Sequence, residues 1–171
     1  AGHGQAHGAF HRRPADRQIK MKNRIEINGR AIGAGCPTYV IAELSANHGQ
    51  SFDQAVELVK TAKACGADAV KLQTYTADTL TIDCDNEYFK ITGTLWNGRT
   101  LYDLYREAFM PWEWQPKLKA LADELGIALF STPFDSSAVD FLEAMGVPAH
   151  KLASFENCDI GLIKSIAATA K

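Results

Sequence analysis

Four short apolar runs, separated by amphipathic segments, organise this chain. They cover residues 38–44 (T-Y-V-I-A-E-L), 69–75, 127–131 and 151–155. Continuous apolar runs of this length are typical of strands in a parallel sheet, which is buried on both faces. We therefore predict four parallel strands over these ranges.

A helical pattern accompanies each predicted strand. The first begins at Ser51, which forms a predicted capping box with Gln54, and ends at Gly66. Two further patterns, with apolar residues three and four positions apart, end at Gly126 and Gly146, and a fourth follows the last strand. Alternating strands and helices predict an α/β fold with a parallel sheet, either doubly wound or a (β/α)₈ barrel.

The segment between the second and third strands, residues 76–114, is unusually long for a strand–helix connection. It is rich in aromatic residues: Tyr88, Phe89, Trp96, Tyr102, Tyr105, Phe109, Trp112 and Trp114. Connections of this length are usually functional, because they wall or cover a site. We predict that this insertion borders the functional site.

Polar residues gather where the predicted strands end, which favours the barrel. They are Glu43, Ser45, Asn47, His48, Gln73, Ser131, Thr132, Asp135, Ser154 and Glu156. Barrel enzymes place their chemistry at this end of the strands, whereas no G-x-G-x-x-G follows any strand to indicate a dinucleotide site. A complete barrel needs about 250 residues, so we predict the N-terminal half of a TIM (β/α)₈ barrel, about four βα units.

Two of the predicted strands carry a lysine, Lys71 and Lys151. Burying a lysine without an anionic partner costs roughly several kcal/mol. Two predicted strands that each carry a lysine and further polar groups therefore indicate a barrel mouth that holds an anionic small molecule. The alternative is that both ammonium groups lie in water at frayed strand ends.

Composition narrows the class of protein. The 171 residues are 46% hydrophobic and 22% charged with a net charge of −2, as in ordinary globular proteins, and nothing favours nucleic acid or an anionic membrane. No apolar run approaches the roughly 18 residues of a membrane span. Cys36, Cys65, Cys84 and Cys158 are widely spaced, so we expect buried free thiols and a cytoplasmic protein. Residues 1–20 resemble a disordered leader or added extension, and we expect the folded domain over residues 21–171.

Several motifs together resemble the sialic acid synthase family. Four lie in order at the strand ends: residues 39–48 (Y-V-I-A-E-L-S-A-N-H), 70–73 (V-K-L-Q), 130–135 (F-S-T-P-F-D) and 151–154 (K-L-A-S). Within the insertion, residues 88–90, 93–105 and 111–114 are similar to the pseudaminic acid synthase branch. The resemblance extends from about residue 24 to residue 171 and implies condensation of phosphoenolpyruvate with an amino-sugar aldehyde. The sugar it implies is 2,4-diacetamido-2,4,6-trideoxy-L-altrose, and the products are a nonulosonic acid (pseudaminic acid) and phosphate.

The resemblance also assigns roles to residues. Glu43 and Glu156 match the acidic catalytic positions, and the substrate-binding positions are matched by Lys71, Gln73, Thr132, Lys151 and Ser154. For Glu43, the alternative is a simple ion pair with a neighbouring lysine. Strand alternation does not put Lys151 and Ser154 on one face, so the strand must end or bulge between them.

Other polar residues at the strand ends are expected to be structural. Asn47 and His48 are expected to hold the loop after the first strand and to help shape the site. His150 is expected to be structural, and Asp135 to cap a helix.

The family further implies a divalent metal (Mn or Mg), a homodimer and a C-terminal antifreeze-like domain. We expect the metal ligands, the second half of the barrel and that domain to be absent from this chain, and the chain alone to be inactive. Two related enzymes stay open, an N-acetylneuraminate synthase and a legionaminate synthase. A chemically different alternative is a Schiff-base aldolase using Lys71 or Lys151. The alternative outside catalysis is a truncated ligand-binding fragment.

Overall fold

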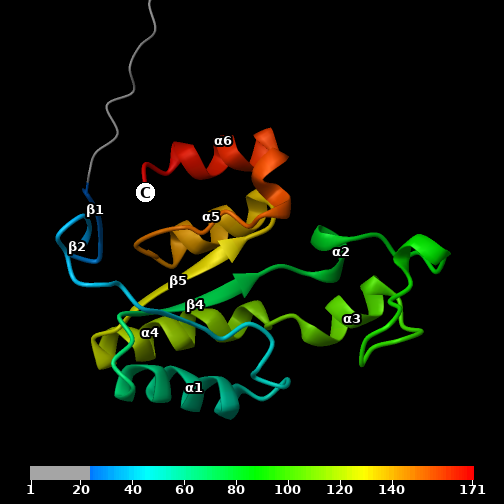
Figure 1. Cartoon of the computed structure of the whole chain (residues 1–171), viewed down its shortest axis with the longest axis horizontal. Coiled ribbons are helices and arrows are strands. Elements are labelled where there is room, and N and C mark those ends of the chain that lie inside the picture. The colour runs from blue at the N-terminus through cyan, green and yellow to red at the C-terminus, as the bar shows by residue number, and fades with distance from the viewer. Residues whose placement is uncertain (1–23) are drawn as a thin grey trace, which may run out of the picture.

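The core of the molecule is a three-stranded parallel sheet. The structure, a computed structural model, describes residues 24–171, so the predicted leader over residues 1–20 and the domain start at residue 21 lie outside the described residues. The strands are β3 (Ile41–Glu43), β4 (Ala69–Thr74) and β5 (Ala128–Pro133), in the order β3-β4-β5. Figure 1 shows β4 and β5 side by side. Their register pairs Glu43 with Lys71 and Gln73 with Thr132.

Helices connect and flank these strands. The main ones are α1 (Phe52–Ala64), α4 (Gln115–Leu125), α5 (Ser136–Ala144) and α6 (Ile160–Ala168). The insertion forms α2 (Ala77–Leu80), a 3₁₀ turn at Glu87–Phe89, α3 (Leu101–Ala108) and a second 3₁₀ turn at Trp112–Trp114. In Figure 1, α1 and α4 run beside each other under β4 and β5, and α2 and α3 lie beyond the carboxyl end of β4. These strand–helix units are part of a TIM (β/α)₈ barrel, which confirms the predicted fold class.

Local sequence signals explain where the helices begin and end. The Ser51 side chain accepts a hydrogen bond from the backbone N–H of Gln54 at 3.2 Å and starts α1. The carboxylate of Asp135 accepts from the N–H groups of Ser137 and Ala138 and starts α5, which confirms the predicted N-cap. Gly126 ends α4 at φ 65°, a left-handed conformation that glycine adopts without steric cost.

Two apolar clusters hold the elements together. The larger joins Val70 and Leu72 of β4 and Leu129 of β5 to α1 and α4. The smaller joins Ala69 of β4 and two residues of β5, Ala128 and Phe130, to Leu142 of α5 and to Val147. Successive residues of β5 thus enter different clusters, because successive side chains of a strand point to opposite faces.

The fourth predicted strand, over residues 151–155, is wrong. Only one bridge joins the sheet there, between Ser131 and His150, with the N–H of Lys151 donating to the carbonyl of Ser131 at 3.1 Å. Ser154 already has helical backbone angles (φ −66°, ψ −36°), and a 3₁₀ turn follows at Phe155–Cys158. The apolar residues that suggested a strand therefore belong to an irregular segment that leaves β5 after one residue.

A hairpin precedes the sheet and was missed in the sequence. It pairs β1 (Arg24–Ile27) antiparallel with β2 (Arg30–Gly33). The turn is Asn28-Gly29, with φ of 50° and 78°. Asn-Gly is the strongest short-range signal for a two-residue hairpin turn, so the sequence did contain the information.

The cysteines are free thiols, but their predicted burial is wrong. Cys65 and Cys158 are exposed, and Cys36 and Cys84 are half-buried. Each lies in a loop or at the end of a helix rather than in either apolar cluster. The wide spacing of the cysteines in the sequence correctly predicted that they form no disulfide bonds, but it carries no information on how deeply each one is buried.

Candidate functional site

A cavity of about 520 Å³ opens at the carboxyl ends of β4 and β5. Four of the seven predicted site residues line it: Gln73, Lys151, Ser154 and Glu156. Its remaining wall is largely aromatic and apolar and consists of Tyr75, Leu80, Tyr105, Phe134, Ala153 and Phe155. The lining therefore combines polar residues, including one cation and one acid, with aromatic and apolar residues.

The irregular segment after β5 explains how Lys151 and Ser154 reach the same cavity. Strand alternation would have turned them to opposite faces. Because pairing with β5 stops at Lys151 and the backbone becomes helical at Ser154, both side chains line the cavity. Because residues 151–155 do not form a strand, strand alternation does not separate the Lys151 and Ser154 side chains.

Glu156 lines the cavity and has one carboxylate oxygen buried without a partner among the described residues. Its residue is half-buried, and its Oε2 atom is buried without a hydrogen-bond partner among residues 24–171. Buried polar atoms in folded proteins are nearly always hydrogen-bonded, so this oxygen is an exception. Because Oε2 is itself shielded from solvent, a molecule in the cavity would meet other atoms of the Glu156 side chain.

The other three predicted site residues do not line this cavity. Lys71 is buried, with its side chain 9% exposed, and its Nζ lies 2.6 Å from Oε1 of Glu43. The Glu43 side chain is 59% exposed, so the pair has one end in the protein and one in water. Thr132 is buried at 1% exposure. The anionic partner that buried Lys71 requires is thus present, and it is the neighbouring glutamate.

Buried polar contacts fix the end of β4 that carries Gln73 and Tyr75. Gln115, fully buried at the start of α4, accepts a hydrogen bond from the hydroxyl of Thr74 at 2.8 Å. The indole N–H of Trp112 donates to the backbone carbonyl of Tyr75 at 3.1 Å. Trp112, at the end of the insertion, and Gln115, the first residue of α4, therefore hold the strand end that faces the cavity.

The aromatic wall was only partly foreseen from the sequence. The insertion borders the site as predicted, through Leu80 on α2 and Tyr105 on α3. Tyr75 packs edge-on against both Tyr105 and Phe134, with ring centroids 5.9 and 5.5 Å apart. Burial, and secondarily Tyr105, raises the pKa of Tyr75 to about 12, so its hydroxyl keeps its proton near neutral pH. Individual wall residues carried no sequence signal beyond their place in the insertion.

The histidines near the strand ends are structural. His48 is 1% exposed, its Nδ1 accepts from the backbone N–H of Gln50 at 3.2 Å, and its ring packs edge-on against Trp114. Burial lowers the pKa of His48. It holds the loop after β3, as predicted, but does not line the cavity. His150 has its Nε2 2.6 Å from the carboxylate of Glu143, away from the cavity lining.

The residues described do not fit the divalent metal that the family resemblance implies. Within residues 24–171, no three His, Cys, Asp or Glu side chains come together to hold an ion. The acidic residue lining the cavity is Glu156. We therefore derive no chemical step through a metal. Across the same residues, no helix combines the length and apolar character that crossing a membrane requires.

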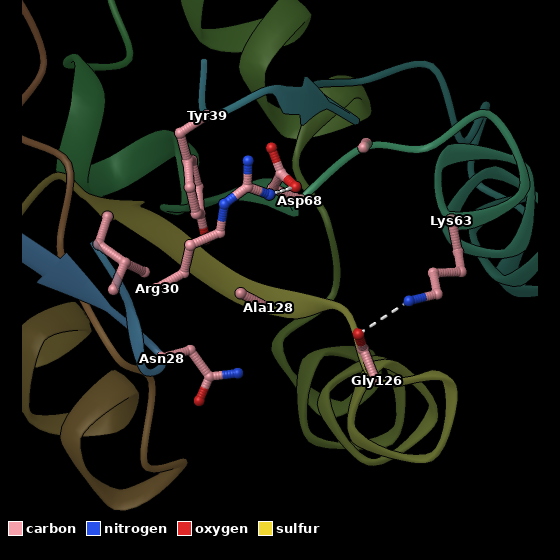
Figure 2. A pocket seen from close by; sticks show the side chains of 9 residues that line it. Asn28, Arg30, Tyr39, Lys63, Asp68, Gly126 and Ala128 are labelled. Carbon is pink, nitrogen blue, oxygen red and sulfur yellow. Dashed lines mark hydrogen bonds and ion pairs between the residues drawn. The ribbon is translucent and has the colours of Figure 1, made fainter. Parts of the chain in front are cut away.

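A smaller cavity, about 190 Å³, lies at the opposite ends of the strands (Figure 2). Arg30 of β2 forms an ion pair with Asp68 and lies over the ring of Tyr39. Lys63 of α1 donates to the carbonyl of Gly126 at 2.9 Å. These contacts bind the hairpin and α1 to the loops before β4 and β5, and we interpret this end as structural.

Parallel strands, flanking helices and a cavity at the carboxyl ends of the strands are the arrangement of part of a (β/α)₈ barrel. The chain belongs to the NeuB family, whose sequence model matches residues 58–171. It is 45% identical over 135 residues to pseudaminic acid synthase of Helicobacter pylori, covering 79% of this chain and 40% of that protein. It is 46% identical over 133 residues to the pseudaminic acid synthase of Campylobacter jejuni serotype O:2, covering 78% of this chain and 39% of that protein. The chain thus spans about 40% of the length of these relatives.

Solved structures agree with this assignment. The N-acetylneuraminic acid synthetase of Leptospira borgpetersenii serovar Hardjo-bovis, in complex with citrate, is 26% identical with a TM-score of 0.72, covering 85% of this chain and 46% of that chain. The spore coat polysaccharide biosynthesis protein SpsE of Bacillus subtilis is 29% identical with a TM-score of 0.66, covering 85% of this chain and 37% of that chain. Both resemble the strand–helix arrangement described above.

Proposed function

We propose that this chain provides the phosphoenolpyruvate-binding part of a nonulosonic acid synthase of the pseudaminic acid type. The observation that carries the proposal is the cavity at the strand ends, where Lys151, Ser154, Gln73 and Glu156 meet. Membership of the NeuB family and 45% identity to pseudaminic acid synthase support the class of reaction. Condensation of phosphoenolpyruvate with 2,4-diacetamido-2,4,6-trideoxy-L-altrose would yield pseudaminic acid and phosphate.

The polar residues that line the cavity suit the anionic substrate. Lys151 supplies a positive charge for a phosphate or carboxylate oxygen, and Ser154 supplies a directed hydroxyl donor. Lys71 and Thr132 belong to the same proposed set, at register positions beside Glu43 and Gln73. Because Lys71 already bonds Glu43, its contribution there is through two further N–H donors.

The proposed reaction balances with one water molecule. The enol carbon of phosphoenolpyruvate attacks the aldehyde carbon of the sugar and forms the new C–C bond, while the aldehyde C=O π bond breaks and its oxygen takes up a proton to become a hydroxyl group. The former enol C2 becomes an oxocarbenium-like centre, and water adds to it and loses one proton, which replaces the proton taken up by the aldehyde oxygen. The resulting hemiketal phosphate loses its hydroxyl proton and expels phosphate by C–O cleavage, which leaves the keto acid and protonated inorganic phosphate.

Two carboxylates are proposed to stabilise the positive charge and to transfer the protons in this reaction. Glu156, the acidic residue that lines the cavity, stabilises the positive centre and accepts the proton of the attacking water. Glu43 is assigned the second acidic role and at the same time neutralises Lys71. Gln73 hydrogen-bonds the sugar.

The whole enzyme is proposed to be a homodimer that includes further barrel strands and an antifreeze-like domain. A polypeptide of only these 171 residues is proposed to bind phosphoenolpyruvate without turning it over, because it spans about 40% of the length of the matched relatives. Turnover by the purified chain alone would contradict this part of the proposal.

The nearest alternatives differ in the sugar. The chain is 36% identical over 151 residues to N,N'-diacetyllegionaminic acid synthase of Legionella pneumophila, below its identity to the pseudaminic enzymes. A Schiff-base aldolase would instead form an imine through Lys151 or Lys71. Borohydride trapping with a carbonyl substrate would label such a lysine, whereas the proposed condensation leaves both unlabelled.

A chimera tests the proposed function. Residues 24–171 would replace the matching segment of the Campylobacter jejuni pseudaminic acid synthase, which supplies the remainder of an enzyme. We expect the folded chimera to release phosphate from phosphoenolpyruvate with the diacetamido sugar, and not with N-acetylmannosamine. Lys151→Met and Glu156→Gln should each reduce the rate by about 100-fold or more. A folded chimera that is inactive, or active only with N-acetylmannosamine, would contradict the proposal.

A further inference from the structure

His150 lies where the segment after α5 pairs with the sheet. Its backbone forms a parallel bridge with Ser131 of β5, and the N–H of the next residue, Lys151, donates to the carbonyl of Ser131 at 3.1 Å. Beyond Lys151 the chain leaves the sheet and enters the 3₁₀ turn at Phe155–Cys158. Because a lysine side chain is long and flexible, the path of the backbone at residues 150 and 151 decides whether its ammonium group reaches the cavity.

The side chain of His150 ties this position to α5. It is 0% exposed, and its Nε2 lies 2.6 Å from Oε1 of Glu143. Burial raises the pKa of the Glu143 carboxyl, but hydrogen bonds from Lys171 and His150 outweigh this effect and hold the pKa below its ordinary 4.5. Glu143 is therefore ionised near neutral pH and can only accept, so Nε2 of His150 carries a proton and donates it.

The imidazole of His150 is not the side chain that stability alone would favour here. While Nε2 donates to Glu143, the other ring nitrogen, Nδ1, is buried without a hydrogen-bond partner among residues 24–171. Buried polar atoms without a partner are unfavourable and rare in folded proteins. An apolar side chain would fill the same space without this cost, so the hydrogen bond to Glu143 is what the imidazole adds at this position.

We propose that Glu143, acting through His150, is a positioning residue that holds Lys151 at the cavity for the anionic substrate. Neither Glu143 nor His150 lines the cavity. The inference rests on the proposed function, because it concerns how the substrate-binding lysine is held. Electrostatics alone predicts the opposite effect, since a carboxylate outside the cavity repels an anion and its removal should strengthen binding. The positioning role predicts that removing Glu143 weakens binding.

Calorimetric titration of phosphoenolpyruvate into variants of the purified chain tests the inference. Glu143→Ala should weaken binding about threefold to tenfold. Glu143→Gln, which keeps an oxygen acceptor for His150, should retain most of the affinity. In a Lys151→Met background, Glu143→Ala should have no further effect, because the lysine that Glu143 positions is gone.

Lys171→Met is the matched control. Lys171 bonds the same Glu143 carboxylate, with Nζ 2.8 Å from Oε1, but does not line the cavity. Its removal leaves the hydrogen bond between Glu143 and His150 in place, so the affinity should not change. Should Glu143→Ala not fold, His150→Phe, which fills the space of the ring without donating to Glu143, takes its place with the same expectations.

The outcomes separate this inference from the proposed function. Unchanged or tighter binding by folded Glu143→Ala would overturn the inference, and so would an equal loss in the Lys151→Met background or with Lys171→Met. If the parent chain binds phosphoenolpyruvate and Glu143→Ala binds it equally well, the inference alone fails. If the parent chain does not bind it, the proposed function fails together with the inference.

Discussion

At the residue scale, Lys71 and Glu43 form an ion pair in which the lysine is buried and the glutamate is exposed to water. The lysine side chain is 9% exposed and the glutamate side chain 59% exposed, with Nζ and Oε1 2.6 Å apart. Removing the lysine leaves a carboxylate that water solvates. Removing the glutamate leaves an ammonium group in the protein interior, which is far more costly.

Two substitutions should therefore differ in their effect on the free energy of unfolding. Glu43→Gln is expected to lower it by about 1–3 kcal/mol, whereas Lys71→Met should change it by less than about 1 kcal/mol. Urea denaturation of the two variants and the parent chain measures this difference. A larger loss for Lys71→Met than for Glu43→Gln would show that the lysine is not held by this carboxylate.

His48 predicts a dependence of stability on pH. Burial lowers the pKa of His48 from its ordinary 6.5, so the folded state favours the neutral ring. Stability is therefore full above pH 6.5 and falls as the pH drops below it, because the unfolded chain takes up a proton that the folded chain does not. The loss is at most about 1.4 kcal/mol per pH unit and ends at the folded-state pKa. NMR titration of the His48 ring should give a midpoint below 6.5, and a midpoint at or above 6.5 would contradict the account.

At the scale of elements, sequence patterns predicted helices better than strands. α1 and α4 end where Gly66 and Gly126 follow them, as expected, because helix stop signals are local. The segment over residues 151–155 failed because a short apolar run does not reveal whether a neighbouring strand is present to pair with it. The insertion was located, but its helices were not, since their short lengths give little periodicity.

The N-cap of α5 gives the prediction at this scale. Asp135 accepts hydrogen bonds from the N–H groups of Ser137 and Ala138 at 3.0 and 3.3 Å. Asp135→Ala should lower the free energy of unfolding by about 1 kcal/mol. Asp140→Ala is the control, because Asp140 is an exposed aspartate on the same helix. Equal losses in the two variants, measured by urea denaturation, would mean that the cap does not stabilise α5.

At the scale of the whole molecule, the two ends of the sheet have different roles. The end closed by the hairpin is fixed by Arg30 with Asp68 and by Lys63 with Gly126. The opposite end carries the cavity of about 520 Å³ and four of the seven residues predicted from sequence. The order of the motifs along the chain was enough to predict that the functional site lies at the carboxyl ends of the strands. It did not reveal the ion pair between Lys71 and Glu43 or the burial of Thr132, because both depend on how neighbouring strands pack.

Calorimetric titration of phosphoenolpyruvate into the purified chain tests the central claim, that the cavity at the carboxyl ends of the strands is an anion-binding substrate site. We expect saturable one-to-one binding that Lys151→Met weakens about tenfold or more. Lys63→Met, which removes the lysine lining the opposite cavity, should leave the affinity unchanged. Binding that survives Lys151→Met in a folded variant, or that is lost with Lys63→Met, would contradict the account.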